Sequence, residues 1–372
     1  MMQQKYKIDI WILLPVLMLM IFSIGAVYSA SSTFAFEKYQ DSNYLFKQHV
    51  IKVVISIAVI FIFAKIDYRY LESIAKHMIW ASVILLLITL FWSSGPIKGA
   101  SRWINLGPLS FQPSELARYT LVIYIALLLA RKKDYIKLLY RGYLPVIFYV
   151  LLVTGLILIQ PNFSMALIIF TSCMVMIYLS DAKRKHIVFT MLALMPLAAL
   201  FILSKDYIMS RITSYADYTS NGNSSYQLQQ ALIGFGNGGL LGIGPGNSNQ
   251  RDFFLPEAHG DFIFSIIGEE YGFIGTFIIL SLYFVILTRG FRIAKESKDE
   301  FGKYLAFGIV MLITMNALVN MSVASGVIPT TGVTLPFVSY GGTSILFTSM
   351  AVGILLNISS QREEIDEGLT IE

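Results

Sequence analysis

Five titratable side chains mark the segment LPEAHGDFIFSIIGEEYG, residues 255–272, as a candidate site for chemistry. Glu257, His259 and Asp261 alternate just before an apolar stretch, and Glu269 and Glu270 fall inside that stretch. A carboxylate close to an imidazole can act as a general base whose pKa is set by its surroundings. The E-x-H-x-D spacing could instead hold a divalent cation, although one imidazole and two carboxylates are a sparse ligand set.

Asp261 has a second interpretation, because carboxylates are also favoured at the N-terminus of a helix. On a helix that begins near Asp261, the small residues Ser265, Gly268, Gly272 and Gly275 share its face by their spacing of three and four residues. Small residues let helices pack closely, so this face is expected to lie against protein. Asp261 is therefore predicted at the outer mouth of an interior cavity, either as a base or as a helix cap.

Glu269 and Glu270 would lie about 12 Å deeper than Asp261 on the same helix. Acids at that depth in an apolar helix cost several kcal/mol unless they are paired or hydrated, so both are functional candidates by default. We nevertheless favour a structural ion pair for them, for example with Arg118. Arg118 lies one turn inside another apolar stretch and is itself expected to face a polar cavity or an acid.

A second candidate region, residues 93–115, reads SSGPIKGASRWINLGPLSFQPSE. Lys98, Arg102 and Trp103 lie close together in it, and Gln112 and Ser114 follow at the start of the next apolar stretch. Lys and Arg side chains hold diphosphates, and Trp prefers the level of lipid headgroups. Contact with lipid headgroups would explain these residues equally well, so both interpretations stay open.

Residues 234–246 form a glycine-rich run, GFGNGGLLGIGPG, that contains a formal G-x-G-x-x-G match. Neither a preceding strand nor a βαβ unit accompanies the match, so a dinucleotide site is not predicted. Glycines at this density indicate backbone with positive φ or close packing. The run is expected to be a tight irregular loop at the membrane surface or a ligand contact.

The composition is that of a membrane protein, since 56% of the 372 residues are hydrophobic and 14% are charged, with a mean hydropathy of +0.66. Soluble domains carry about 25% charged residues, so a water-soluble α/β enzyme is excluded. Apolar runs of roughly 18 residues predict spanning helices rather than barrel strands. Lys and Arg gather in short loops, which indicates cytoplasmic loops and no nucleic-acid binding. Cys173, the single cysteine, is expected to be a core residue.

The predicted fold class is an all-α polytopic membrane protein with about ten transmembrane helices. The first apolar run, Ile10 to Val27, is too long for a cleavable signal peptide and is interpreted as a retained helix. The basic loops alternate so that both termini are cytoplasmic. We expect one membrane domain over residues 1–372, with residues 205–260 as a large extracytoplasmic loop between helices 7 and 8. The spans are predicted at 9–28, 49–65, 74–92, 114–131, 143–159, 162–180, 187–204, 261–288, 304–326 and 340–358.

Three long motifs resemble the SEDS family of cell-wall polymerases, which contains FtsW, RodA and the sporulation protein SpoVE. They read KGASRWINLGPLSFQPSELARY, GIGPGNSNQRDFFLPEAHGDFIFSIIGEEYGFIG and GVIPTTGVTLPFVSYGGTS, and the resemblance covers nearly the whole chain. The GNSNQ run before LPEAH is closer to FtsW members than to RodA members. The resemblance implies a bacterial cytoplasmic-membrane enzyme that polymerises lipid II, an undecaprenyl-diphosphate-linked disaccharide, into glycan strands outside the membrane.

The resemblance also implies roles for the candidate residues. Asp261 would be the essential acid, acting as general base on the acceptor hydroxyl. Arg102 and Lys98 would hold diphosphate or sugar, and Glu257 and His259 would orient the acceptor or a divalent cation, Mg²⁺ or Mn²⁺. The remaining substrate-binding candidates are Trp103, Gln112, Ser114, Arg118 and Ser339.

Two positions depart from the family pattern, Gly260 and Thr331, and the latter lacks the Lys that many FtsW sequences carry. Arg118 and Arg251 are candidates for a replacement cation. The expected partners are a class B penicillin-binding protein transpeptidase and other divisome or elongasome membrane proteins, with no soluble cofactor. Two other functions stay open: a flippase that moves lipid II across the membrane, and a division scaffold without chemistry.

Overall fold

The computed structural model describes residues 8–91, 102–106, 109–221, 226–253, 255 and 258–361. Two of the candidate site residues, Lys98 and Glu257, lie outside these ranges.

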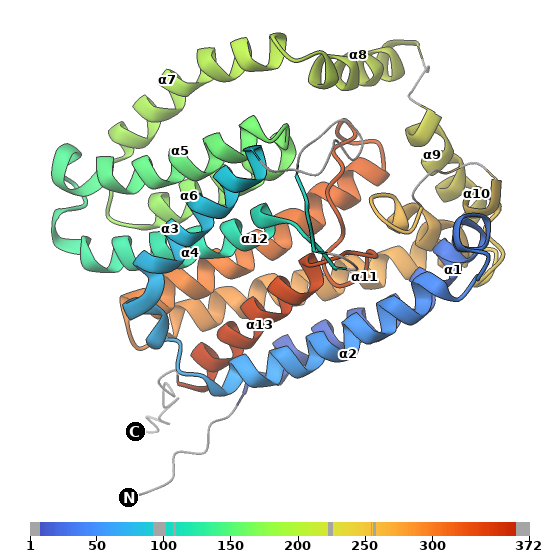
Figure 1. The fold of residues 1–372 in the computed structure, drawn as a ribbon, viewed down its shortest axis with the longest axis horizontal. Coiled ribbons are helices and arrows are strands. Elements are labelled where there is room, and N and C mark those ends of the chain that lie inside the picture. The colour runs from blue at the N-terminus through green and yellow to red at the C-terminus, as the bar shows by residue number, and fades with distance from the viewer. Residues whose placement is uncertain are drawn as a thin grey trace, which may run out of the picture.

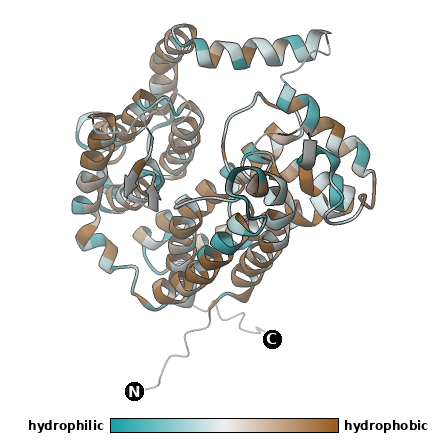
Figure 2. Cartoon of the chain, turned by 45° about the vertical axis from the view of Figure 1, so that its right-hand side comes forward, coloured by the Kyte–Doolittle hydropathy of each residue, from teal (hydrophilic) through white to brown (hydrophobic). Residues whose placement is uncertain are grey.

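All ten predicted spans coincide with helices, which confirms the all-helical polytopic fold (Figure 1). Eight helices in the described part of the chain are long and apolar enough to cross a membrane, while α6 and α13 are shorter apolar helices of 17 residues each. Figure 2 shows the apolar residues concentrated along these helices. The bounds are α1 (Ile10–Tyr39), α2 (Tyr44–Lys65), α3 (Tyr70–Phe91), α4 (Pro113–Arg131), α5 (Leu144–Ile159), α6 (Phe163–Leu179), α7 (Arg184–Leu203), α11 (Ile263–Lys295), α12 (Glu300–Ala324) and α13 (Ser344–Ser360).

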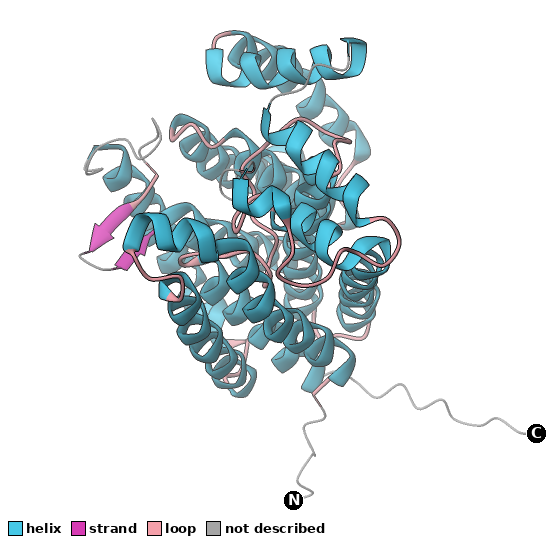
Figure 3. Ribbon diagram, turned by 90° about the vertical axis from the view of Figure 1, so that its right-hand side faces the viewer, coloured by secondary structure: helices cyan, strands magenta, loops and turns pink. Residues whose placement is uncertain are grey.

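Short elements complete the chain. Residues Lys133–Tyr135 form a 3₁₀ turn, and Leu139–Tyr143 form a π-helical turn that leads into α5. A small antiparallel hairpin, β1 (Ile104–Leu106) and β2 (Leu109–Phe111), precedes α4 and was not predicted (Figure 3). Because Pro113 follows the hairpin at the first turn of α4, the chain changes from strand to helix within two residues.

α4 occupies the centre of the bundle and packs against α3, α5, α6, α12 and α13. Nearly all of its side chains are buried, including the charged Glu115 and Arg118. A helix that is buried on every face cannot show an apolar stripe, which is why hydropathy alone predicts this span but not its central place.

α1 continues eleven residues beyond its predicted end at residue 28, because Ser31 and Ala35 are buried and keep the helix against protein. It ends at Gln40, whose φ of 58° is left-handed. At its other end, the Asp9 amide donates to Ser359 Oγ at 3.2 Å, and the Asp9 carboxylate pairs with Arg289 at 2.8 Å. The beginning of α1 and the ends of α11 and α13 therefore lie on one side of the bundle.

Residues 205–260, predicted as a long loop, contain three helices: α8 (Asp206–Asn221), α9 (Tyr226–Gly238) and α10 (Asn249–Phe253). α8 lies across one edge of the molecule (Figure 1). Side chains fasten α8 to residues 327–331, since Arg211 donates to the Thr331 carbonyl at 3.1 Å and Tyr215 donates to the Val327 carbonyl at 2.6 Å.

α11 is broken at Gly272, whose φ and ψ of 65° and −162° interrupt the helix. The glycine-rich run satisfies the freed backbone groups. Ile243 and Gly244 amides donate to the Glu269 and Glu270 carbonyls, each at 3.0 Å, and the Phe273 amide donates to the Gly239 carbonyl at 2.9 Å. Irregular backbone at membrane depth is stable only where protein supplies such partners. The run was expected to be either a tight irregular loop or a ligand contact. Its described contacts are with the backbone of α11.

Candidate functional site

A cavity of about 700 Å³ lies where the hairpin, α8 and the ends of several spans meet. The N-terminal ends of α4, α6, α11 and α13 all border it, through Gln112, Asn162, Asp261 and Ser344 respectively. The N-terminal end of a helix carries partial positive charge and free amides, so this convergence favours an anionic ligand.

Many of the residues predicted from sequence meet in this cavity. The predicted residues that line it are Arg102, Trp103, Gln112, Arg118, His259 and Asp261. Arg102 and Asp261 are 159 residues apart in the chain, and the fold brings them to one site. Asp261 itself lines this cavity.

The turn that carries Asp261 is held by its backbone carbonyls. The Tyr340 amide donates to His259 O at 2.9 Å, the Ser339 hydroxyl donates to Gly260 O at 2.7 Å, and the Asn320 side chain donates to Asp261 O at 2.8 Å. α11 begins two residues later, at Ile263, with Phe262 in the N-cap position. The helix-cap interpretation of Asp261 is therefore wrong, because Asp261 does not occupy the cap.

Gly332 forms the wall opposite the carboxylate. Its φ is +78°, and a Cβ built on it would lie 3.4 Å from Asp261 Oδ2. The absence of a side chain at this position leaves the Asp261 carboxylate open to the cavity. A second cavity of about 280 Å³, lined by Ser210, Arg211 and Gln227 among others, reaches Asp261 from the side of α8.

Arg102 is a half-buried cation tied to the end of α5. Its guanidinium donates to the carbonyls of Gln160 and Pro161. Burial lowers the pKa of Arg102, the positive charge of Arg211 lowers it further, and the Asp261 carboxylate opposes both effects. The guanidinium thus interacts electrostatically with the candidate base across the cavity.

Arg118 faces both an acid and the cavity, as predicted for it. Its guanidinium pairs with Glu115 at 2.7 Å, one turn earlier on α4, and both side chains are buried. It also donates to Thr348 Oγ1 at 3.1 Å on α13. The proposed pairing of Arg118 with Glu269 or Glu270 is wrong, because Glu115 lies closer on its own helix.

Two predicted substrate contacts have other surroundings. Ser339 accepts from the Leu335 amide at 2.8 Å while it donates to Gly260 O, so its hydroxyl supports the Asp261 turn. Ser114 is fully buried on α4, and its hydroxyl has no hydrogen-bond partner among the described residues. Neither side chain is among those that line the described cavity.

His259 borders the cavity with its ring between two aromatic residues. The centroid of the His259 ring lies 5.0 Å from the centroid of the Phe34 ring and 5.7 Å from that of the Tyr340 ring. No group of three His, Cys, Asp or Glu side chains that could hold a metal ion occurs among the described residues. Glu257 lies outside those residues, and no chemical step is assigned to a metal.

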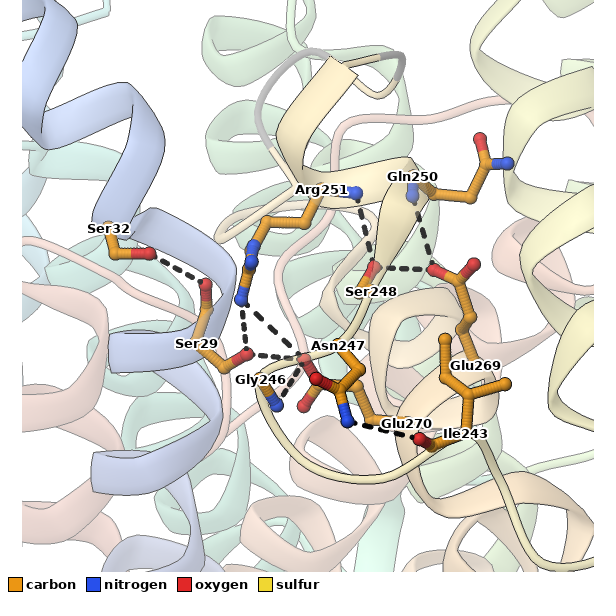
Figure 4. A network of polar contacts seen from close by, with 10 residues as sticks. All are labelled: Ser29, Ser32, Ile243, Gly246, Asn247, Ser248, Gln250, Arg251, Glu269 and Glu270. Carbon is orange, nitrogen blue, oxygen red and sulfur yellow. Dashed lines mark hydrogen bonds and ion pairs between the residues drawn. The ribbon is translucent and has the colours of Figure 1, made fainter.

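Glu269 and Glu270 are held in a buried network with the 246–251 segment (Figure 4). Glu269 accepts from the Ser248 hydroxyl and from the Gln250 amide at 3.3 Å. Glu270 accepts from the Ser29 hydroxyl and the Gly246 amide at 3.1 Å, and it pairs with Arg251 at 3.9 Å. The structural interpretation of these acids is supported, with Arg251 as the cation.

Sequence analysis missed several residues of the site: Glu115, Arg211, Gln227, Asn316, Asn320 and Tyr340. Two of these carried a signal, since Asn316 and Asn320 are polar residues within the apolar span α12. Glu115 could have been found from its spacing of three residues to Arg118. Arg211 gave no signal, because its segment was interpreted as a loop.

The FtsW/RodA/SpoVE family, described as cell cycle proteins, matches residues 10–364 of this chain. The chain belongs to this family. A relative from Geobacter metallireducens, named "Probable peptidoglycan glycosyltransferase FtsW", is 37% identical over 357 residues, which are 95% of each chain.

Two solved structures share the fold. A chain from a peptidoglycan synthase complex, in a study of how polymerization and crosslinking are coordinated, is 26% identical with a TM-score of 0.79, covering 96% of this chain and 99% of that one. The rod shape determining protein RodA of Thermus thermophilus is 24% identical with a TM-score of 0.71, covering 96% and 98%. The family and the fold are thus those expected from the three sequence motifs.

Proposed function

We propose that this multi-pass membrane protein is a peptidoglycan glycosyltransferase that polymerises lipid II, with Asp261 as the general base. The observation that carries the proposal is the meeting of the Asp261 carboxylate with the cation Arg102 and several helix N-termini around a cavity of about 700 Å³. The name of the 37% identical relative supports the same reaction class.

The reaction needs a base and a stabilised leaving group. Asp261 takes the proton of the acceptor sugar hydroxyl as its oxygen bonds to the anomeric carbon of the donor sugar. The bond from that carbon to the lipid diphosphate breaks, and its electron pair stays on the diphosphate. Arg102 and the helix N-termini stabilise the charge that develops there.

The support of the Asp261 turn explains how the base is oriented. Three consecutive carbonyls of this turn accept hydrogen bonds from Tyr340, Ser339 and Asn320. The position of the turn therefore does not depend on the Asp261 side chain. Little reorganisation of this turn is then needed when the acceptor binds.

Arg118 is assigned to substrate binding together with Glu115. Glu115 neutralises the buried guanidinium, and both side chains reach the same cavity. A neutral pair of this kind suits hydrogen bonding to sugar hydroxyls, whereas the more exposed Arg102 suits the diphosphate.

The role in the cell follows from the FtsW-like features. We assign the chain to septal wall synthesis, with both termini in the cytoplasm, the cavity outside, and a class B penicillin-binding protein as its crosslinking partner. A tagged copy is expected at midcell during division. Patches along the side wall would instead assign it to elongation.

The sequence argument for a flippase is weakened, because the charges on which it depended have structural partners. It relied on the deep charges Glu269, Glu270 and Arg118 as a transport site. Each of these has a structural partner, Ser248, Arg251 and Glu115 respectively.

Purified protein in proteoliposomes, with its crosslinking partner if polymerisation requires it, separates the three functions. Fluorescent lipid II should be converted into glycan strands that a gel resolves by length. Transfer of lipid II between leaflets without longer glycan would indicate a flippase, and neither activity would indicate a scaffold.

A further inference from the structure

A separate cavity of about 320 Å³ lies beside the polar one and is mostly apolar. Leu167 and Ile168 of α6, Ile212 of α8 and Val319 of α12 contribute to its lining. Arg102, Tyr207 and Arg211 line this apolar pocket and the 700 Å³ cavity alike, so the two spaces meet at these side chains.

Arg211 stands at the junction of the spaces described so far. It lines the apolar pocket, the 700 Å³ cavity and the 280 Å³ cavity that reaches Asp261. One guanidinium nitrogen of Arg211 donates to the Thr331 carbonyl at 3.1 Å, which fixes the side chain to the loop beside Gly332. The remaining donors of the fork are available to a ligand.

Arg102 and Arg211 line the same two spaces, and after burial the positive charge of Arg211 contributes to the lowered pKa of Arg102. Neither forms an ion pair with a carboxylate of the described residues. An anion bound between two such positive charges stabilises both. A guanidinium group can donate two parallel hydrogen bonds to two oxygens of a phosphate.

The apolar pocket can also be reached from the outer surface of the helices. Leu167, on the apolar span α6, is 51% exposed, and Ile212, on α8, is 38% exposed, although both line the pocket. A hydrocarbon chain could therefore pass from the pocket to the lipid-facing surface without crossing the polar cavity.

We propose that the apolar pocket binds the first isoprene units of the donor lipid and that Arg102 and Arg211 bind its diphosphate. This inference rests on the proposed glycosyl transfer and specifies where its leaving group lies. The acceptor's diphosphate does not fit this place, because a disaccharide separates it from the hydroxyl that Asp261 deprotonates. The donor's diphosphate is bonded directly to the reacting carbon.

The geometry divides the reaction between two spaces. The acceptor sugar and donor sugar share the 700 Å³ cavity at Asp261, while the polyprenyl diphosphate lies toward α6 and α8. As the carbon–oxygen bond breaks, the electron pair moves onto the diphosphate oxygen between the two guanidinium groups, and the proton from the acceptor hydroxyl stays on Asp261. Polyprenyl diphosphate then leaves along the apolar pocket.

Photocrosslinking with a sugar-free polyprenyl diphosphate tests the assignment. The probe carries a diazirine in an early isoprene unit and is added to the full-length protein in detergent. Crosslinks are expected on α6 near Ile168 and on α8 near Ile212, and undecaprenyl diphosphate should compete for them. Arg211→Ala should reduce the yield at subsaturating probe about tenfold, since one charge-assisted interaction is lost. Arg211→Lys should reduce it less, because the charge is kept but the fork is lost.

Matched variants separate the pocket from general damage. Lys205→Ala removes an exposed cation just before α8 that lines none of the three described cavities, and should leave the yield unchanged. Leu167→Trp should block the pocket and lower the yield, whereas Leu200→Trp on the exposed surface of α7 should not. Equal yields for Arg211→Ala and Lys205→Ala, or crosslinks that map away from α6 and α8, would overturn the inference.

Asp261→Asn distinguishes this inference from the proposed function. The variant should keep the crosslinks while it loses polymerisation, because it retains the pocket and lacks the base. Polymerisation by wild-type protein without crosslinks on α6 or α8 would reject the pocket and keep the function. Crosslinks at the expected positions in a wild-type protein that makes no glycan would keep the lipid diphosphate site and reject glycosyl transfer.

Discussion

At the scale of single residues, the site combines the Asp261 carboxylate with cations whose charges are differently balanced. Asp261 lines the cavity opposite Gly332, Arg118 is neutralised by Glu115, and Arg102 donates to the backbone carbonyls of Gln160 and Pro161. These differences suit a base, a sugar-binding pair and a diphosphate-binding cation. They also make separate predictions for each position.

Gly332→Ala should lower polymerisation about tenfold or more with a small loss of stability. The new methyl would lie 3.4 Å from Asp261 Oδ2 and would strain a backbone with φ of +78°. Polymerisation rate and thermal unfolding are measured on the same preparation. Gly236→Ala, where the added Cβ meets nothing within 4 Å, is the control and should change neither. Wild-type activity in Gly332→Ala would show that this wall is not required.

Arg118→Met should destabilise the protein by about 3–5 kcal/mol, because Glu115 is left as a buried charge without its partner. The double variant with Glu115→Gln should recover most of that stability but not polymerisation. Unfolding in detergent and glycan synthesis are the two readouts. Full activity of the double variant would exclude the pair from substrate binding.

Asp261, Arg102 and Arg118 could be named as candidates from the sequence because each is a charge that an apolar span or an outer loop disfavours, and the structure places all three around one cavity. Ser114 and Ser339 were predicted to bind substrate but do not line the described cavity, since a hydroxyl in a motif looks the same whether it meets substrate or backbone. Ser339 holds Gly260 O, a contact that depends on how α11 and α13 meet in space. Such contacts cannot be inferred from local spacing.

At the scale of elements, the broken α11 and the glycine-rich run form one unit. The run supplies hydrogen bonds to both sides of Gly272, and two of its glycines, Gly238 and Gly242, lie too close to the α11 backbone for a side chain. The break at Gly272 ends the first part of α11, which begins at Ile263. Glu269 and Glu270, in this first part, accept hydrogen bonds from the 246–251 segment. The unit therefore sets the orientation of the first turns of α11, directly after Asp261.

Gly242→Ala should destabilise the protein more than Gly246→Ala. Both glycines have positive φ, +83° and +80°, so each substitution costs about 1–2 kcal/mol in backbone strain. At Gly242 the added Cβ would also collide with the Glu270 carbonyl, whereas at Gly246 it meets nothing within 4 Å. Thermal unfolding of both variants compares them, and equal shifts would mean that the run does not pack on α11 as described.

At the scale of the whole molecule, the spans could be predicted and their neighbours could not. Each span has a hydropathy signal of its own, but that signal does not tell which spans lie in the centre, as α4 does, and which lie at the edge, as α7 does. α7 has no buried side chain within the described part of the chain, and Figure 1 shows it standing off the bundle. Residues 205–260 were predicted only as a loop, because their short helices depend on tertiary partners such as Thr331 and Val327.

Cysteine labelling tests the orientation of the molecule. The one native cysteine, Cys173, is buried and should stay unlabelled. Asp217→Cys on α8 should react with a membrane-impermeant maleimide in intact cells, since α8 borders the outer cavities. Lys137→Cys, in the loop between α4 and α5, should react only after permeabilisation. The reverse pattern would place the cavity in the cytoplasm and exclude polymerisation outside the membrane.

The most direct test of the central claim compares Asp261→Asn with Asp217→Asn, an exposed acid on α8 that lines none of the three described cavities. Glycan synthesis from lipid II is measured for both purified proteins at equal amounts of folded material. A general base at Asp261 predicts a rate about 10²–10⁴-fold lower for Asp261→Asn and an unchanged rate for Asp217→Asn. Glycan synthesis by Asp261→Asn at the wild-type rate would contradict the mechanism.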